Sequence, residues 1–244
     1  MTDFIRKSTV DEIRKRFDRD VERFTNEVSG QTATVDAALV LDLIADSVKE
    51  IQGNAASILD IGCGGGNFTI RILRKIPGLH CTLLDLSRRM IDRAAERVHS
   101  AGGIVDRIIQ EDVRTADMGS GQFDIVVSGA VLHHLRNRTE WIDVFRKIHR
   151  AMKPGGTYWF WDLVRHENGE IEKVQRARYE EFLRGVGGKE YQDEVFAYIE
   201  REDTPESATF IIQSLAEAGF VKIDILHKNV CYAAVMAVKP PDFR

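Results

Sequence analysis

One segment carries the strongest structural signal in the chain, and it reads Leu59-Asp60-Ile61-Gly62-Cys63-Gly64-Gly65-Gly66-Asn67. It completes a short apolar run that begins at Ser57, and such a run ending in glycines is typical of a buried strand that leads into a loop. Glycines let the backbone turn sharply and approach a ligand at the carboxyl end of that strand. The segment therefore predicts a ligand-binding loop at the edge of a sheet. The alternative is a glycine-rich turn that binds nothing.

Strand-like and helix-like segments alternate beyond this loop. Further strands are expected at His80–Leu84, Val105–Ile109, Phe123–Ser128 and Thr157–Trp161, with helices between them at Thr69–Ile76, Arg88–Ser100 and Thr139–Met152. Continuous apolar runs such as residues 125–127 are typical of strands that are covered on both faces. The alternation predicts a parallel sheet with helices on both sides and right-handed crossovers.

The C-terminal part continues this pattern and then changes it. A helix is expected to open at Pro205 and to end at Gly219. Two strands follow, Val221–Leu226 and Cys231–Val238, and the three residues His227-Lys228-Asn229 are expected to link them. Because so short a link demands an antiparallel pair, we expect a Rossmann-like α/β fold: a seven-stranded, mostly parallel sheet with an antiparallel C-terminal hairpin.

Helical patterns also lie outside the alternation. Amphipathic helices are expected over residues 9–28 and 35–51, and a helical insertion over 163–203, interrupted by glycines at 185–188. Within a single domain of residues 1–244, we expect the helices of 1–51 and the insertion 163–203 to form a lid over the carboxyl ends of the strands. Apolar side chains in the insertion also make it the expected surface of a homodimer. They are Phe182, Tyr191, Phe196 and Tyr198.

Composition excludes several classes of protein. The 244 residues are 43% hydrophobic and 30% charged, which is ordinary for a soluble globular chain. A net charge of -4 argues against a general polyanion binder, so direct nucleic-acid binding is not expected. Three scattered cysteines argue against a disulfide framework or a structural zinc site, and no metal is expected. Without a signal-peptide core or a bilayer-spanning apolar run, a cytoplasmic location and no membrane partner are expected.

A carboxylate at the end of the second strand points to a nucleoside ligand. Asp85 follows Gly62 by about 20 residues, where nucleotide-binding folds place an acid that accepts both ribose hydroxyls. The alternative is that Asp85 caps the next helix, although Ser87 is better suited to that role. A dinucleotide fingerprint would require glycine at position 67, where Asn67 stands, and the carboxylate of Asp60 would repel a diphosphate. A cationic nucleoside fits this loop better.

The run ILDIGCGGGNFT, residues 58–69, resembles the first motif of class I S-adenosylmethionine (SAM) dependent methyltransferases. Further matches follow in the order of that family, over about residues 55–162. Asp85 resembles the acid that binds the ribose, and Glu111-Asp112-Val113 the motif that reads the adenine. Phe123–Ser128 resembles the family's fourth strand, and Leu132-His133-His134-Leu135 resembles the loop after it. Met152-Lys153-Pro154-Gly155-Gly156 resembles the turn before the family's fifth strand.

The resemblance implies SAM as cofactor and methyl transfer to a small-molecule acceptor. It implies the following cofactor contacts: Asp60, Gly62, Cys63, Gly64, Asp85, Leu86, Met90, Asp112, Val113, Ser128 and His133. No catalytic residue is identified; His133 and Asp162 are weak candidates for a base, which is needed only if the acceptor is protonated. Trp161 is either packed inside the strand or a wall of an apolar substrate cleft.

A second resemblance leads to an alternative function. The segments RFDRDVERF, residues 16–24, and EDTPESATFIIQSLAEAGF, residues 202–220, are similar to the carboxy-SAM synthase family, which acts on SAM itself for tRNA wobble-uridine modification. That family carries an arginine where this chain has Ser214, a tyrosine where it has Gln31, and a serine where it has Gly64. Without the arginine the extra carboxylate would be unpaired, so a methyltransferase is preferred. A SAM-fold binding protein without activity and a nicotinamide enzyme are the remaining alternatives.

Overall fold

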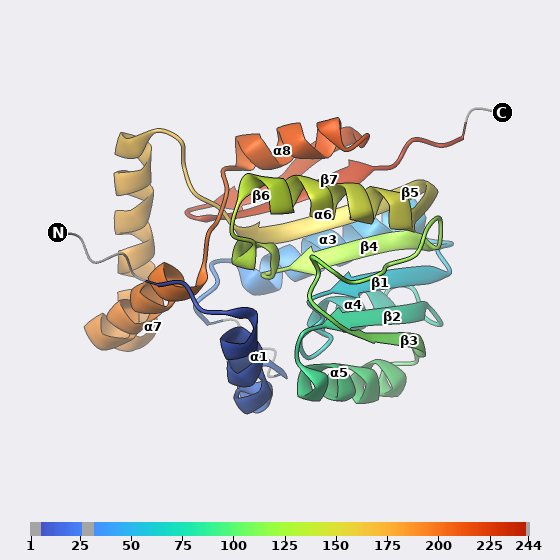
Figure 1. The fold of residues 1–244 in the computed structure, drawn as a ribbon, viewed down its shortest axis with the longest axis horizontal. Helices are drawn as coiled ribbons and strands as arrows, with labels where there is room; N and C mark the ends of the chain where they lie inside the picture. The colour runs from blue at the N-terminus through green and yellow to red at the C-terminus, as the bar shows by residue number, and fades with distance from the viewer. Residues whose placement is uncertain (1–5, 26–31, 243–244) are drawn as a thin grey trace.

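The computed structural model describes residues 6–25 and 32–242 and contains a seven-stranded sheet in the order β3-β2-β1-β4-β5-β7-β6 (Figure 1). All neighbouring pairs are parallel except those that involve β7, which runs antiparallel to both β5 and β6. The predicted architecture is therefore confirmed. The strands are β1 (Ser57–Ile61), β2 (His80–Asp85), β3 (Ile104–Gln110), β4 (Phe123–Gly129), β5 (Met152–Leu163), β6 (Val221–Asn229) and β7 (Tyr232–Val238).

Helices cover both faces of the sheet and enclose two separate cores. On one face, α3 (Ala37–Gln52), α4 (Asn67–Leu73) and α5 (Arg88–Ser100) share a core with Trp159 and Trp161 of β5. On the other face, α6 (Arg138–Ala151) and α8 (Ala208–Glu217) share a core with Tyr158 and Phe160. Successive side chains of a strand point to opposite faces, so the aromatic run of β5 contributes to both cores.

Two predicted boundaries are wrong for local reasons. The helix expected over 9–28 ends at Asp20, which separates α1 (Val10–Arg19) from α2 (Val21–Thr25); the end of the predicted helix, like Gln31, lies outside the described residues. Helix α8 begins three residues later than Pro205, because the hydroxyl of Ser207 accepts a hydrogen bond from the amide of Phe210 and caps the helix.

The C-terminal hairpin is also tighter than predicted. The three residues expected to form the link belong to β6, which continues to Asn229. The chain reverses at Val230, whose φ of 50° is the left-handed conformation that such tight turns require. No residue separates α6 from β5. Met152, which is expected to end the helix, follows it directly and begins the strand, five residues before the predicted start at Thr157.

The predicted lid is correct for some helices and wrong for one. Helices α1, α2 and α7 (Gly169–Glu202) lie beyond the carboxyl ends of the parallel strands, where their side chains help to line a cavity (Figure 1). As the glycines at 185–188 predict, α7 is interrupted by a kink at Gly187 and Gly188, where the backbone is not helical. Helix α3 instead packs against the face of the sheet, because its apolar stripe of Val40, Ile44 and Val48 is almost completely buried there. None of the described helices combines the length and apolarity needed to cross a bilayer.

Candidate active site

A cavity of about 720 Å³ lies at the carboxyl ends of the strands. Its wall is built from the glycine loop after β1, the ends of β2 and β4, the short helix η2 (Leu132–His134), and side chains of α1, α2 and α7. Parallel sheets collect their ligands at this edge, beside the loops that leave the strands. The volume is within the usual range of about 300–1,000 Å³ for small-molecule sites.

The glycine loop has a backbone that only glycine adopts easily. Gly62 and Gly64 have φ values of 64° and 49°. A Cβ at Gly62 would lie 2.5 Å from Cγ2 of Val131, so even alanine would collide there. A Cβ at Gly64 would meet no protein atom within 4 Å. The loop is thus held tightly at its base and open toward the cavity at Gly64.

Asp85 is held at the end of β2 with its carboxylate on the cavity wall. One carboxylate oxygen accepts a hydrogen bond from the amide of Gly64 at 2.9 Å, and the other accepts one from the amide of Ser87 at 2.9 Å. Burial raises the pKa of Asp85. Helix α5 is capped by Ser87, whose hydroxyl accepts from the amide of Met90, so Asp85 is not its cap. Each carboxylate oxygen of Asp85 still has a lone pair that can accept a hydrogen bond from a ligand hydroxyl.

Asp112 lies on the same wall but is already paired. Its carboxylate forms two side-chain hydrogen bonds with Arg114, at 2.8 and 2.6 Å. Burial opposes ionisation of Asp112, yet these bonds outweigh burial and lower its pKa. Leu86, Met90 and Val113 line the same cavity and add apolar surface to the two acids. This combination suits a flat, polar-edged group such as a purine.

The predicted cofactor residues separate into two groups. Nine of them line the cavity: Gly62, Cys63, Gly64, Asp85, Leu86, Met90, Asp112, Val113 and His133. Asp60 and Ser128 are not among the lining residues; Asp60 accepts a hydrogen bond from the hydroxyl of Thr69 at 2.7 Å, and Ser128 pairs with the hydroxyl of Tyr158 at 2.6 Å. These two support the loop and the strand from within, and direct contact of any of the eleven with a cofactor remains a prediction.

The two base candidates form a buried pair. Asp162 is fully buried and lies outside the cavity lining; one of its oxygens accepts hydrogen bonds from the amides of residues 131–133, at 3.2, 2.8 and 3.3 Å. Its other oxygen pairs with Nδ1 of His133. Burial opposes the charged form of His133, but the carboxylates of Asp162 and Asp203 outweigh it and raise its pKa to about 9. An imidazole that keeps its proton at neutral pH is a poor base, so neither candidate has the arrangement of a base.

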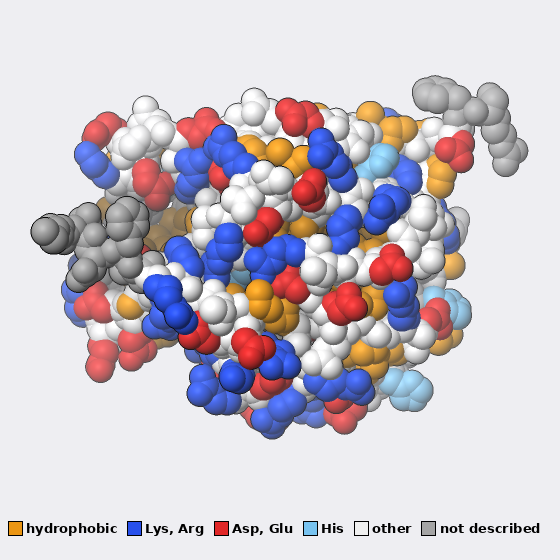
Figure 2. All heavy atoms as spheres, viewed as in Figure 1, with side chains coloured by type: hydrophobic (Ala, Val, Ile, Leu, Met, Phe, Trp, Pro, Cys, Tyr) orange, Lys and Arg blue, Asp and Glu red, His pale blue; other side chains and the backbone are white. Residues whose placement is uncertain are grey.

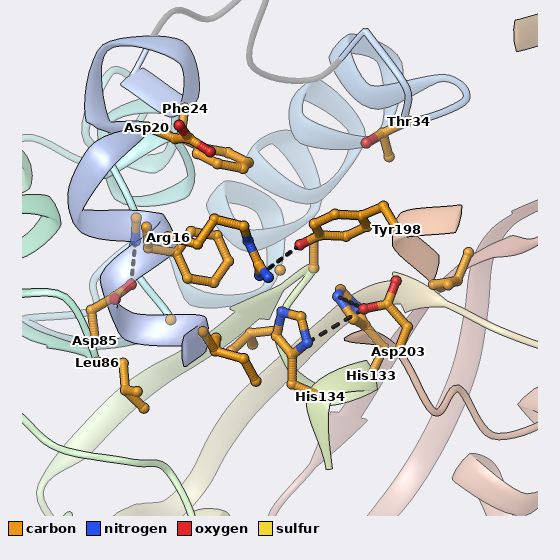
Figure 3. A pocket seen from close by; sticks show the side chains of 18 of the residues that line it. Arg16, Asp20, Phe24, Thr34, Asp85, Leu86, His133, His134, Tyr198 and Asp203 are labelled. Carbon is orange, nitrogen blue, oxygen red and sulfur yellow. Dashed lines mark hydrogen bonds and ion pairs between the residues drawn. The ribbon is translucent and has the colours of Figure 1, made fainter. Parts of the chain in front are cut away.

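Sequence reasoning missed the groups that the lid brings to the cavity. Arg16 of α1 donates a hydrogen bond to the hydroxyl of Tyr198 of α7 at 2.9 Å (Figure 3). The guanidinium of Arg16 also lies 2.6 Å from the carboxylate of the buried Glu202. Asp203, directly after α7, lies beside His133 and His134 (Figure 3). In the sequence these residues are ordinary members of charged helices, and only the packing of α1 against α7 brings them together.

Aromatic rings form the part of the wall nearest α7. Trp161 lies on the cavity wall, with ring centroids 5.8 Å from Phe68 and 6.1 Å from Tyr232. Tyr179 and Tyr191 of α7 line the same region. The reading of Trp161 as a cleft wall is thus supported, although the side chain also belongs to the core. The region suits an apolar or aromatic group.

Comparison with known proteins finds similarity to methyltransferases. The family described as "Methyltransferase domain" matches residues 59–158. YqeM of Bacillus subtilis, which is named as a methyltransferase, is 30% identical over 171 residues, covering 70% of this chain and 57% of YqeM. The carboxy-S-adenosyl-L-methionine synthase of Shewanella baltica is 24% identical over 204 residues, covering 82% of this chain and 83% of the synthase. The chain spans only about half of the first relatives that it matches.

Solved structures agree with this assignment at the level of the fold. Human N-acetylserotonin methyltransferase in complex with SAM superimposes with a TM-score of 0.61 at 14% identity. The match covers 96% of this chain and 63% of the human protein.

Proposed function

Since the chain carries a domain of the class I SAM-dependent methyltransferase family, we propose that it transfers a methyl group from SAM to a small-molecule acceptor. One observation carries this proposal: a single cavity joins the glycine loop and Asp85 at one side to the aromatic wall of α7 at the other. A donor and an acceptor would therefore meet in one enclosed volume.

The residues present fit SAM. Gly64 leaves open space where any other residue would carry a Cβ, so a ligand can approach its backbone. Asp85 offers carboxylate oxygens for hydroxyl donors, and Asp112 lines the same cavity together with apolar side chains. When bound, the cofactor supplies an electrophilic methyl group on a sulfonium. The chain itself contributes orientation and exclusion of water, the effects on which such a displacement depends.

The lid favours a small acceptor over a macromolecule. Helices α1, α2 and α7 cover the strand ends, and the ion pair between Arg16 and Glu202 ties α1 to the end of α7. The face of the molecule in Figure 2 carries Lys and Arg interspersed with Asp and Glu, without a continuous basic surface that would attract a nucleic acid. Tyr179, Tyr191 and Trp161 would enclose an apolar or aromatic acceptor.

A carboxy-SAM synthase is the second candidate, and the relative from Shewanella baltica that covers 82% of this chain favours it. Against it stands Ser214, which lies buried in α8 and does not line the cavity. Three of the four guanidinium groups on the wall have acidic partners: Arg16 and Arg201 pair with Glu202, and Arg114 pairs with Asp112. An extra carboxylate would have to compete at those three, whereas Arg23 lies over the ring of Phe24. This second function therefore ranks below methyl transfer.

We also propose that the protein is a cytoplasmic homodimer that binds no nucleic acid. Of the predicted stripe on α7, Tyr191, Phe196 and Phe182 pack against the chain's own core. Other apolar side chains of α7 are exposed and could form the contact instead; they are Ile171, Val174 and Val186, exposed by 48, 57 and 43%. Light scattering tests the assembly, and a strict monomer would refute the dimer.

Turnover tests the activity directly. The protein is incubated with SAM and a panel of small aromatic and aliphatic acceptors, and formation of S-adenosylhomocysteine is followed by mass spectrometry. We expect acceptor-dependent turnover for at least one apolar acceptor. Formation of a carboxylated SAM from SAM and prephenate would instead support the synthase. Binding of SAM without turnover on any acceptor would support a binding protein.

A further inference from the structure

Two histidines and an aspartate meet on the cavity wall, in an arrangement that methyl transfer as described above does not use. His133 and His134 end the short helix η2, and Asp203 follows α7 (Figure 3). Nε2 of His133 lies 3.6 Å from Oδ1 of Asp203, and Nδ1 of His134 lies 3.4 Å from the same oxygen. One ligand atom from each of the three residues falls within 4.8 Å of the others. All three residues line the cavity.

Oδ1 of Asp203, the oxygen that lies near both imidazoles, accepts no hydrogen bond from the described residues. This oxygen is buried, and only 4% of the side chain is exposed. A buried carboxylate without a hydrogen-bond donor is costly unless a cation compensates it. Arg16, whose guanidinium acts on Asp203, is itself paired with Glu202. Without a metal, protonated His133 offsets the charge of this carboxylate, and a metal ion would take the place of the proton on Nε2. The side chain is thus aimed at the two imidazoles, with an oxygen available to a ligand.

The spacing of these atoms fits a metal ion. With metal–nitrogen and metal–oxygen bonds of about 2.0–2.2 Å, two ligand atoms of a tetrahedral ion lie about 3.4 Å apart. The two separations from Oδ1, 3.6 and 3.4 Å, are close to that length. In bonds to zinc and its neighbours in the first transition series, imidazole nitrogen and carboxylate oxygen are ordinary ligands.

Asp162 gives His133 the orientation of a metal ligand. It pairs with Nδ1 of the imidazole and so directs Nε2 toward Asp203. Histidines that bind metals usually donate the other ring nitrogen's proton to a carboxylate or carbonyl in this way. Asp162 is itself fixed by three backbone amides of the loop, so it acts as a positioning residue.

We propose that His133, His134 and Asp203 bind a divalent transition-metal ion of the zinc class, with an open coordination position toward the cavity. Three protein ligands with a fourth position free are the arrangement of catalytic rather than structural zinc sites. The positive charges that oppose the ion are Lys7, Arg16 from α1 and Arg136 beside η2, and the acids that favour it are Asp162, Asp203 and Glu202. Arg16 forms an ion pair with the carboxylate of Glu202, and Arg136 donates a hydrogen bond to the backbone oxygen of Glu202.

The ion narrows the class of acceptor, and this step rests on the proposed function. An acceptor hydroxyl in the open position would lose its proton near neutral pH, because a bound cation lowers the pKa of a coordinated oxygen. The proton leaves for solvent, and the oxygen's electron pair forms the bond to the methyl carbon as the carbon–sulfur bond breaks. The acceptor class is then a hydroxyl-bearing apolar molecule, and no side-chain base is required.

Metal binding is tested without any methyl acceptor. The full chain is stripped with a chelator, exchanged into chelator-free buffer, and titrated with Zn²⁺ by calorimetry and with Co²⁺ by visible absorption. We expect one ion per chain, and an intense Co²⁺ spectrum typical of fewer than six ligands. Absence of stoichiometric binding by either method would overturn the proposal.

Variants locate the ion. We expect Asp203→Asn to weaken Zn²⁺ binding by more than 100-fold. Asp162→Asn removes the orienting partner of His133 and one nearby negative charge but no metal ligand, and we expect it to weaken binding by about 10–100-fold. His80→Gln is the matched control, because His80 pairs with Asp106 on the exposed surface at 2.9 Å. Thermal unfolding verifies that each variant is folded.

Unchanged Zn²⁺ affinity in a folded Asp203→Asn variant would refute the site. Binding of S-adenosylhomocysteine to the metal-free protein is measured in parallel. If it binds while Zn²⁺ does not, the metal proposal fails and the proposed function stands. If neither binds, both fail.

Discussion

The two sides of the cavity are built in different ways. On the cofactor side, the glycine loop and Asp85 follow β1 and β2 directly, and their positions depend on local backbone geometry and on adjacent parallel strands. On the lid side, Arg16 and Asp203 come from segments almost two hundred residues apart in the chain, and they are held by side-chain contacts. Local geometry leaves a recognisable pattern in the sequence, whereas contacts between distant helices do not.

Alanine at Gly62 is expected to have the largest effect on the cofactor side. The φ of 64° disfavours any side chain, and the new Cβ would lie 2.5 Å from Val131. We expect Gly62→Ala to reduce affinity for S-adenosylhomocysteine by more than 100-fold, as measured by calorimetry. Gly78→Ala is the control, since Gly78 has a φ of 79° but open space around it. If both variants bind equally well, the cofactor side does not depend on the loop as described.

Removal of the Asp85 carboxylate is expected to have the next largest effect. Asp85→Ala removes a charged acceptor for two hydroxyl donors, which is worth roughly 1–3 kcal/mol of binding free energy. Affinity for S-adenosylhomocysteine should fall accordingly in calorimetry. Asp106→Ala, a change to an exposed acid near the start of β3, should leave the affinity unaltered. Equal affinities for the wild type and Asp85→Ala would refute the ribose assignment.

The sequence predicted most of the cofactor side and little of the lid side. The seven strands, their order of appearance and nine of the eleven expected cavity residues follow from apolar runs, glycines and acids at fixed positions. The family resemblance implies cofactor contacts for Asp60 and Ser128 as well, but neither lines the cavity, and each bonds to a neighbouring hydroxyl within the fold. The alternation of side chains along a strand, which is invisible in a short motif, decides this.

On the lid side, the sequence predicts that the helices exist but not where each of them packs. It places α3 in the lid, whereas the apolar stripe of α3 is buried against the sheet. Arg16 was one of several arginines in a charged helix, and Asp203 one acid in a linker. Their roles depend on which helix packs against which, a tertiary property without a local signal.

Arg16 provides a test of the lid side. Replacing it with methionine removes its ion pair with Glu202 and its hydrogen bond to Tyr198. Because Glu202 keeps Ser8 and Arg201 as partners, we expect a loss of about 1–2 kcal/mol in unfolding free energy rather than the larger cost of an isolated buried charge.

Hydrogen exchange should be faster in α1 of Arg16→Met, while the affinity for S-adenosylhomocysteine changes less than in Asp85→Ala. Arg14→Met, which removes an exposed pair with Asp11, is the control. A stability equal to that of the wild type would mean that the pair does not tie α1 to α7.

The smallest expected effect concerns the support beneath the loop and depends on pH. Burial raises the pKa of Asp60 from its ordinary value of 3.8 to about 7. The folded state therefore binds more protons than the unfolded state between these values, and stability falls as the pH rises through them. Asp60→Asn removes this titration but keeps an acceptor for Thr69.

We expect Asp60→Asn to be about as stable as the wild type at pH 5 and more stable than the wild type at pH 8, by thermal unfolding. The same difference at both pH values would contradict a raised pKa.

Native mass spectrometry of the full chain after incubation with SAM tests the central claim most directly, namely that the cavity between the glycine loop and the lid is a SAM site. We predict a mass increment equal to SAM or S-adenosylhomocysteine, retained by the wild type and by His80→Gln but lost in Gly62→Ala. An increment larger by one carboxyl group would make the synthase the leading function. No increment in the wild type would contradict the account.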